Sequence, residues 1–226
     1  MAVAAVVVGG AGPGEAATRN PNACKWSLDA NYRNTPVTLA GTPKGTAAAG
    51  KTVTLTRTSA RAALPDALVA AGFGVGFLKE GLNELPVEVT VAIAATNTRE
   101  AVQVVRATTT ASTTITVRDG KPSATPIKAA VKFPDTAWTA SGGKIAFSQA
   151  APDTIGSVPG AGRAGEAVAA SGSVFIHATV GTVALNLDCV PGRQNPEAQD
   201  GNPPFTTYLP AASVAPFAVA KSSDAK

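Results

Sequence analysis

The sequence predicts an all-β fold, an antiparallel sandwich-like domain with one short helix. The first observation behind this prediction is that apolar and polar residues alternate one by one in several runs. Side chains of a strand point to opposite faces in turn, so this pattern indicates strands with one face in a core. The second is composition, because Ala, Gly, Val, Thr and Pro dominate and only 15% of residues are charged. Polar partners on the second face favour antiparallel sheets, since central parallel strands are apolar on both faces.

Residues 1–17 predict a partial signal-peptide-like segment. A short apolar run is followed by small residues, which is typical of the hydrophobic region and cleavage zone of a secretory signal. The basic start of such a signal is missing, because Arg19 is the first positive residue. We therefore interpret the start as clipped or wrongly assigned; a short N-terminal strand or tail is the alternative. No later run reaches the roughly 20 apolar residues of a spanning helix, so no transmembrane segment is predicted.

The chain has two cysteines, Cys24 and Cys189, and both fall on the apolar side of an alternating run. The first run is predicted as one strand over 24–32, with its inward positions at Cys24, Trp26, Leu28, Ala30 and Tyr32. Cys189 follows Val183, Leu185 and Leu187 at the same spacing. We predict one disulfide that brackets the domain; two separate buried thiols are the alternative. A structural disulfide indicates an oxidising compartment, so the protein is expected to be secreted or at the cell surface.

Further strands are predicted wherever the alternation recurs. They lie near 37–39, 53–55, 87–93, 115–117, 127–133, 174–180 and 183–189. The last two are separated only by Gly181 and Thr182, which predicts a hairpin. Glycine-rich stretches at 41–50, 139–143 and 156–173 are predicted loops.

One helix is predicted over 59–71. Ser59 would be its N-cap and Gly72 its C-terminal stop, while Pro65 would shorten it, with a start as late as Leu64. The domain itself is predicted over 18–193, and the proline-rich segment 194–226 is predicted to be an extended tail. Residues 97–100 fit either a boundary between two halves or an ordinary turn.

No catalytic, cofactor-binding or metal-binding residues are predicted. Two glycine-rich stretches, 12–17 and 160–165, have the spacing of a dinucleotide fingerprint. Neither has the strand and helix that this motif requires around it, so we interpret them as signal remnant and loop. His177 is the single histidine, which limits nucleophile-base chemistry and metal sites. It lies between the inward positions Ile176 and Ala178 of a predicted strand, so it should face solvent.

Trp138 is the candidate for ligand contact. It follows Pro134 and Asp135 in a predicted loop, where an exposed indole could stack on carbohydrate, whereas Trp26 shares the inward parity of Cys24. Threonines such as those at 108–110 predict a solvated sheet face. The alternative for these threonines is O-glycosylation or a polar surface that meets glycan.

The sequence resembles a secreted actinobacterial β-rich domain family of unknown function. Cys24-Lys25-Trp26, Ala63-Leu64-Pro65, the Thr/Val strands and a terminal Cys189-Val190-Pro191-Gly192 carry the resemblance, over about residues 22 to 195. The resemblance implies export and a disulfide, and it carries no catalytic residues across.

The function predicted from these observations is a non-catalytic extracellular or cell-envelope binding or structural role. Cell-wall glycan or another protein subunit would be the partner. A net charge of +4 without a basic patch indicates no nucleic acid. One alternative is a self-assembling surface subunit that uses sheet-edge or tail addition, and another is a secreted hydrolase.

Overall fold

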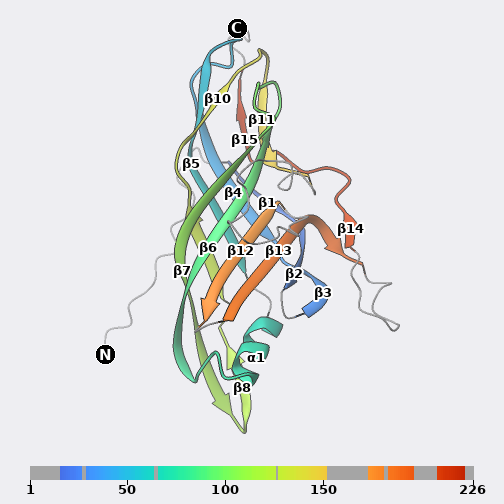
Figure 1. Cartoon of the computed structure of the whole chain (residues 1–226). Coiled ribbons are helices and arrows are strands. Elements are labelled where there is room, and N and C mark those ends of the chain that lie inside the picture. The colour runs from blue at the N-terminus through green and yellow to red at the C-terminus, as the bar shows by residue number, and fades with distance from the viewer. Residues whose placement is uncertain are drawn as a thin grey trace.

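The computed structural model describes residues 16–26, 29–63, 66–125, 127–151, 173–180, 183–195 and 208–221. The predicted fold class is confirmed, because these residues form antiparallel strands and one short helix (Figure 1). The first strands are β1 (Ala16–Asn20), β2 (Asn22–Trp26), β3 (Asp29–Asn34), β4 (Val37–Lys44) and β5 (Thr52–Ala63), followed by the helix α1 (Asp66–Gly74). Next come β6 (Gly81–Ala95), β7 (Val102–Arg118), β8 (Lys121–Ala124), β9 (Lys128–Lys132), β10 (Thr136–Thr139) and β11 (Ile145–Gln149). The last are β12 (Val174–Val180), β13 (Val183–Gln194), β14 (Tyr208–Pro210) and β15 (Ala218–Ala220).

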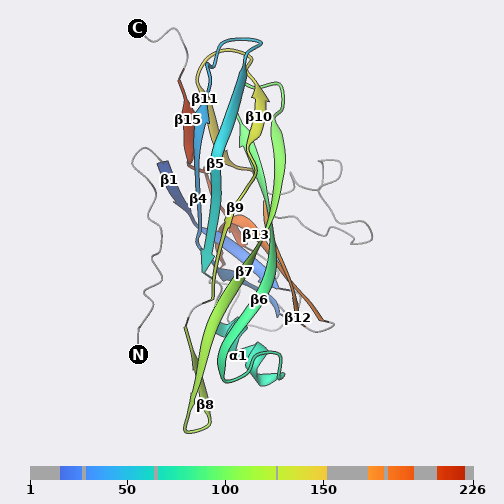
Figure 2. The same ribbon diagram turned by 90° about the vertical axis from the view of Figure 1, so that its left-hand side faces the viewer.

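The strands hydrogen-bond in the order β1-β4-β5-β9-β7-β6-β12-β13-β2-β3. β8 pairs with the end of β7, β10 pairs with β5, β14 pairs with β13, and β11 lies between β6 and β15. The long β6–β7 hairpin runs along the length of the molecule, and α1 lies at the same end as β8 (Figures 1 and 2). Residues 97–100 are the turn of this hairpin, so they divide no domains.

One hydrophobic core holds the sheet together. The same cluster joins Leu39 of β4, Ile93 of β6 and Cys189 of β13, which are distant in the strand order. The sheet therefore bends over and packs its inner face against itself, as two layers of a sandwich do. Alternation places these residues inside: in β5, for example, Val53 and Leu55 are buried, while Thr52 is exposed and Thr54 half-buried.

The predicted helix is wrong in its first half. Residues 59–63 continue β5, where Ala60 and Ala62 are buried and alternate with exposed Arg61 and Ala63. The helix begins only at Asp66, directly after Pro65, and runs through Gly72 to Gly74. The two-residue alternation of β5 continued past Ser59, and strand pairing with β4 and β9 outweighed the helix propensity of alanine.

The single strand predicted over 24–32 is also wrong, because the chain turns back within it. β2 and β3 form an antiparallel pair in which Ala23 lies opposite Asn34 and Trp26 opposite Asp29. Parity along the chain could not show the reversal, because the turn exchanges the two parities: Cys24 of β2 shares a face with Arg33 of β3, and Trp26 with Asp29. Tyr32 therefore packs with Ala23 and Val190 in a cluster separate from that of Cys24, and its predicted place on the same face as Cys24 is wrong. The hairpin of β12 and β13, in contrast, is confirmed, with Val180 opposite Val183.

Part of the segment predicted as a tail belongs to the β domain. β13 extends to Gln194, and within 194–226 the structure describes two further strands, β14 and β15. Phe217 is fully buried in the core, and its N–H donates to the carbonyl oxygen of Phe147 at 2.8 Å. Gly192 allows β14 to approach β13, because a Cβ there would lie 2.4 Å from the carbonyl oxygen of Leu209. Most of the predicted signal segment, residues 1–15, lies outside the described residues, and residues 16–17 begin β1.

Candidate functional site

The predicted disulfide is confirmed. Cys24 in β2 lies directly opposite Cys189 in β13, with 4.0 Å between their Cα atoms and 2.08 Å between their sulfur atoms. Both residues are fully buried. The bridge therefore joins two neighbouring strands whose residues are 165 positions apart in sequence.

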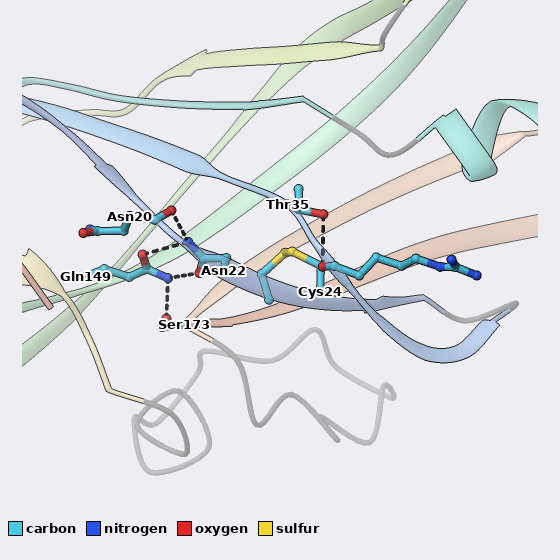
Figure 3. Close-up of a disulfide and its surroundings, with 8 residues drawn as sticks. Asn20, Asn22, Cys24, Thr35, Gln149 and Ser173 are labelled. Atoms are coloured by element: carbon cyan, nitrogen blue, oxygen red, sulfur yellow. Dashed lines mark hydrogen bonds between the residues drawn. A yellow bond between two sulfur atoms is a disulfide. The ribbon is translucent and has the colours of Figure 1, made fainter. Parts of the chain in front are cut away.

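A buried polar cluster lies beside the disulfide (Figure 3). The Gln149 side chain donates from Nε2 to Asn22 Oδ1 at 2.6 Å and to Ser173 Oγ at 2.8 Å. Asn22 returns a hydrogen bond from Nδ2 to Gln149 Oε1 at 3.3 Å, and it also donates to the carbonyl oxygen of Asn20 at 3.1 Å. None of these four residues is more than 4% exposed. Since each amide satisfies the other, the cluster fixes the position of Asn22.

Asn22 is also at the floor of a surface pocket of about 400 Å³, here called the corner pocket. Its lining is Arg19, Pro21, Asn22, Asn34, Thr35, Pro36 and Arg193. The pocket lies where the chain passes from β1 to β2 at Pro21 and from β3 to β4 at Pro36. Asn22 and Thr35 are buried beneath it, while Arg19, Asn34 and Arg193 are exposed at its rim. Its volume falls in the range of small-molecule sites.

The titratable side chains that line the corner pocket are both cationic. They are Arg19 and Arg193, and the lining includes no Asp or Glu. The Asn34 carbonyl oxygen Oδ1 already accepts from the backbone N–H of Gln194 at 2.7 Å, which leaves the amide N–H groups as the donors of that side chain. This arrangement attracts an anion.

Backbone hydrogen bonds make the corner rigid. The Thr35 N–H donates to the carbonyl oxygen of Asn22 at 2.8 Å, and the Gly192 N–H donates to that of Pro21 at 3.0 Å. The rings of Pro21 and Pro36 restrict their own backbone angles. The pocket is therefore built on fixed strands and their crossings, and the disulfide joins β2 to β13 two residues from Asn22.

The prediction that His177 faces solvent is wrong. Only 7% of it is exposed, and its Nδ1 lies 2.6 Å from Asn186 Oδ1. β12 lies between β6 and β13, so Glu88 and Asn186 stand directly opposite His177 on either side. Residues directly opposite in a sheet have Cβ atoms about 5 Å apart, close enough for flanking side chains to cover the imidazole.

The polar row around His177 continues into β7. Arg106 Nε lies 3.6 Å from Glu88 Oε1 and donates to Thr90 Oγ1 at 3.2 Å. Thr90 and Glu88 are neighbours on the same face of β6, and His177 follows on β12. The row stabilises partly covered charged groups by pairing across strands.

Trp138 does not lie in a loop. It is in β10, opposite Val53 of β5, and only 1% of it is exposed. Its indole N–H donates to Thr136 Oγ1 at 3.2 Å, and its ring contacts that of Phe147 edge to face with centroids 5.6 Å apart. Pro134 and Asp135 precede a short strand here, and β-pairing turned the tryptophan into the core. A ligand could reach the indole only if β10 moved.

The residues of the corner pocket were not predicted as a site. Two signals in the sequence mark the corner: Asn20 is followed by Pro21, and Thr35 by Pro36. Each proline ends a strand, but only the tertiary structure brings Arg193 to the same place. The two glycine-rich fingerprints, in contrast, lie outside the described residues except for Ala16 and Ala17. In the described ranges no group of three His, Cys, Asp or Glu side chains forms a metal site, and no helix is long and apolar enough to cross a membrane.

No protein-family model matches the chain, and no curated protein matches it. Among solved structures, the chain is similar to a crystal structure described as "Putative membrane anchored protein from Corynebacterium diphtheriae". The sequence identity is 9% and the TM-score 0.41, and the match covers 94% of this chain and 38% of that chain. This chain thus spans little more than a third of that protein's length. A likeness at this level carries no argument about location or activity.

Proposed function

We propose that the protein works outside the cytoplasm, secreted or at the cell surface, and that it acts by binding and not by catalysis. The observation that carries this proposal is the corner pocket together with the disulfide beside it. The bridge joins the two strands that bring Asn22 and Arg193 to the pocket. Stability and binding therefore depend on the same pair of strands.

The disulfide supports the location. Structural disulfides persist in oxidising compartments and are rare where thiols are kept reduced. Cys24 and Cys189 are the only cysteines, they are paired, and neither has exposed surface. Such a bridge forms during folding in an oxidising environment and is then protected from exchange.

The geometry of the corner pocket supports binding. Its donors stand on strands or directly beside prolines, and buried hydrogen bonds hold its floor. A site that is already ordered loses little conformational entropy when a ligand binds. Cell-wall glycan, or a protein subunit of the envelope, is the partner class that we propose.

Two measurements test this proposal. The chain, expressed in an actinobacterial host behind an intact secretion signal, should be recovered from the medium or envelope with an intact mass two hydrogen atoms lighter than the reduced form. Wild-type protein should also sediment with isolated envelope fragments in a saturable manner, without changing their chemical composition. Recovery only in the cytosol with free thiols, or no saturable binding, would contradict the proposal. Turnover of envelope material that is lost in His177→Ala would favour the hydrolase alternative.

Self-assembly has one observation in its favour. β15 adds to β11 within the chain, which shows that the C-terminal segment can complete a sheet edge. The same segment could add to the edge of a neighbouring copy. Light scattering over a hundredfold range of concentration separates the two modes, since the binding proposal predicts a constant monomer mass.

A further inference from the structure

We propose that the corner pocket binds a phosphate ester, with the phosphate held by Arg19 and Arg193 and the organic part against Pro21 and Pro36. This inference rests on the proposed function, because it assigns a ligand class to the same pocket. It starts from the lining of the pocket, in which both titratable groups are cationic.

Charge favours phosphate over carboxylate. A phosphomonoester carries about −1.5 to −2 charges at neutral pH, while a carboxylate carries one. The guanidinium groups of Arg19 and Arg193 carry two positive charges. Their sum balances the charge of a phosphomonoester and exceeds that of a carboxylate. Among the described residues, neither Arg19 nor Arg193 forms an ion pair with a carboxylate.

Hydrogen-bond geometry favours the same group. Each guanidinium can donate two parallel hydrogen bonds, and arginine pairs with phosphate in this bidentate way. The side-chain amide of Asn34 adds N–H donors, because its Oδ1 already accepts a hydrogen bond from the backbone N–H of Gln194 at 2.7 Å. A phosphate has three terminal oxygens, one for each of these three side chains, whereas a carboxylate has two.

The volume of the corner pocket and its apolar walls favour a phosphate ester over free inorganic phosphate as the ligand. The pocket of about 400 Å³ is in the range that holds an organic molecule. Pro21 and Pro36 contribute apolar ring surface to its walls. An organic group such as a sugar or an aromatic ring would cover that surface while the phosphate stays at the arginines.

The disulfide-bonded protein should be titrated calorimetrically with phenyl phosphate, inorganic phosphate and benzoate at low ionic strength. We expect phenyl phosphate to bind more tightly than either of the others, and its affinity to fall as salt is added, since the arginines are exposed. Arg19→Gln and Arg193→Gln should each weaken binding roughly 10-fold or more, the equivalent of one lost charge-assisted contact. Arg118→Gln is the matched control, because it removes one exposed arginine at the far end of β7 and should leave binding unchanged.

Equal binding of benzoate and phenyl phosphate would overturn the assignment to phosphate. Unchanged affinity in the Arg19→Gln, Arg193→Gln double variant, or a loss in Arg118→Gln of the same size, would overturn the assignment to this pocket. Circular dichroism of each variant checks that the fold is retained. Glucose 1-phosphate and vesicles that contain phosphatidic acid then separate a sugar-borne phosphate from a lipid-borne one.

The two proposals can fail separately. If wild type binds envelope fragments but not phenyl phosphate, the phosphate assignment fails while the binding function stands. If wild type binds phenyl phosphate but no envelope fragment, the pocket assignment stands and the proposed function fails.

Discussion

At the scale of single residues, the protein buries two amide side chains that hydrogen-bond to each other. Asn22 and Gln149 come from β2 and β11, which are 127 residues apart in sequence, and they exchange two hydrogen bonds. Removing either leaves the other amide buried with a polar group that has lost its partner, which costs about 1–3 kcal/mol. Apolar packing around them cannot replace these contacts, since a carbonyl oxygen without a donor remains desolvated.

This pair predicts a non-additive double-mutant cycle. Asn22→Ala and Gln149→Ala should each lower the free energy of unfolding by about 1–3 kcal/mol, and the double variant should lose less than the sum. Urea unfolding of the four proteins measures this coupling. Thr110→Ala, at an exposed position of β7, serves as control and should stay within about 0.5 kcal/mol of wild type. Additive losses would show that the two amides do not act together.

Glu100 predicts a pH dependence. The backbone N–H of Thr139 donates to its Oε2 at 2.8 Å, and together with its own backbone N–H and the Thr139 hydroxyl this holds the pKa of Glu100 below the ordinary 4.5. A carboxyl whose pKa is lowered by folding stabilises the protein above its unfolded pKa, and the contribution is lost as the pH falls through the folded pKa.

Wild type should therefore be more stable than Glu100→Gln at neutral pH, and the difference should shrink as the pH falls below 4.5. Thermal unfolding of both proteins across this range measures the difference. Glu84→Gln, at an exposed position of β6, is the comparison and should show no such trend. A constant difference between wild type and Glu100→Gln would mean that the charge of Glu100 is not involved.

At the scale of elements, the short C-terminal strand β15 is fixed mainly by the buried side chain that precedes it, and less by its own backbone pairing. β15 has three residues, and the fully buried Phe217 precedes it. A Cβ at Gly41 would lie 3.1 Å from the Phe217 ring, so glycine at this position of β4 makes room for the ring. The carbonyl oxygen of Pro216 also accepts from Thr18 Oγ1 at 3.1 Å, which ties the segment to β1.

Phe217→Ala should release β15 from β11. The loss of a buried phenylalanine costs about 3–5 kcal/mol, which is a large share of the stability of an ordinary domain. Val219→Ala in the same strand is the matched control, because Val219 is 37% exposed and should cost far less. Hydrogen exchange of the β11 amides together with urea unfolding measures both effects. Equal stability losses in the two variants would contradict an anchoring role for Phe217.

At the scale of the whole molecule, the disulfide closes a loop of 165 residues. Constraining a loop of that size removes denatured-state entropy worth about 5 kcal/mol in the chain-entropy model. The Cys24→Ala, Cys189→Ala variant should therefore unfold at a much lower urea concentration than the oxidised wild type. The reduced wild type should behave like the variant, and a variant as stable as the oxidised protein would contradict this account.

The alternation of apolar and polar side chains was enough to predict the disulfide and one hairpin from the sequence alone. It placed both cysteines inward, so the disulfide was predictable, and it located the hairpin of β12 and β13. It succeeds because the two-residue period of a strand fixes which face each side chain occupies. The same rule could not tell one strand from two, which is why the reversal between β2 and β3 was missed.

The pairing of strands in the tertiary structure decided which polar and aromatic side chains are buried and which residues meet in one pocket. Local alternation along the sequence leaves both questions open. His177 is buried and lies between Glu88 and Asn186 of the neighbouring strands, and Trp138 is buried in β10, which pairs with β5. Arg19 and Arg193 share a pocket only because β13 pairs with β2 at the proline corner. Periodicity describes the faces of one strand, whereas a site is set by contacts between strands far apart in the chain, and those depend on pairing order and sheet curvature.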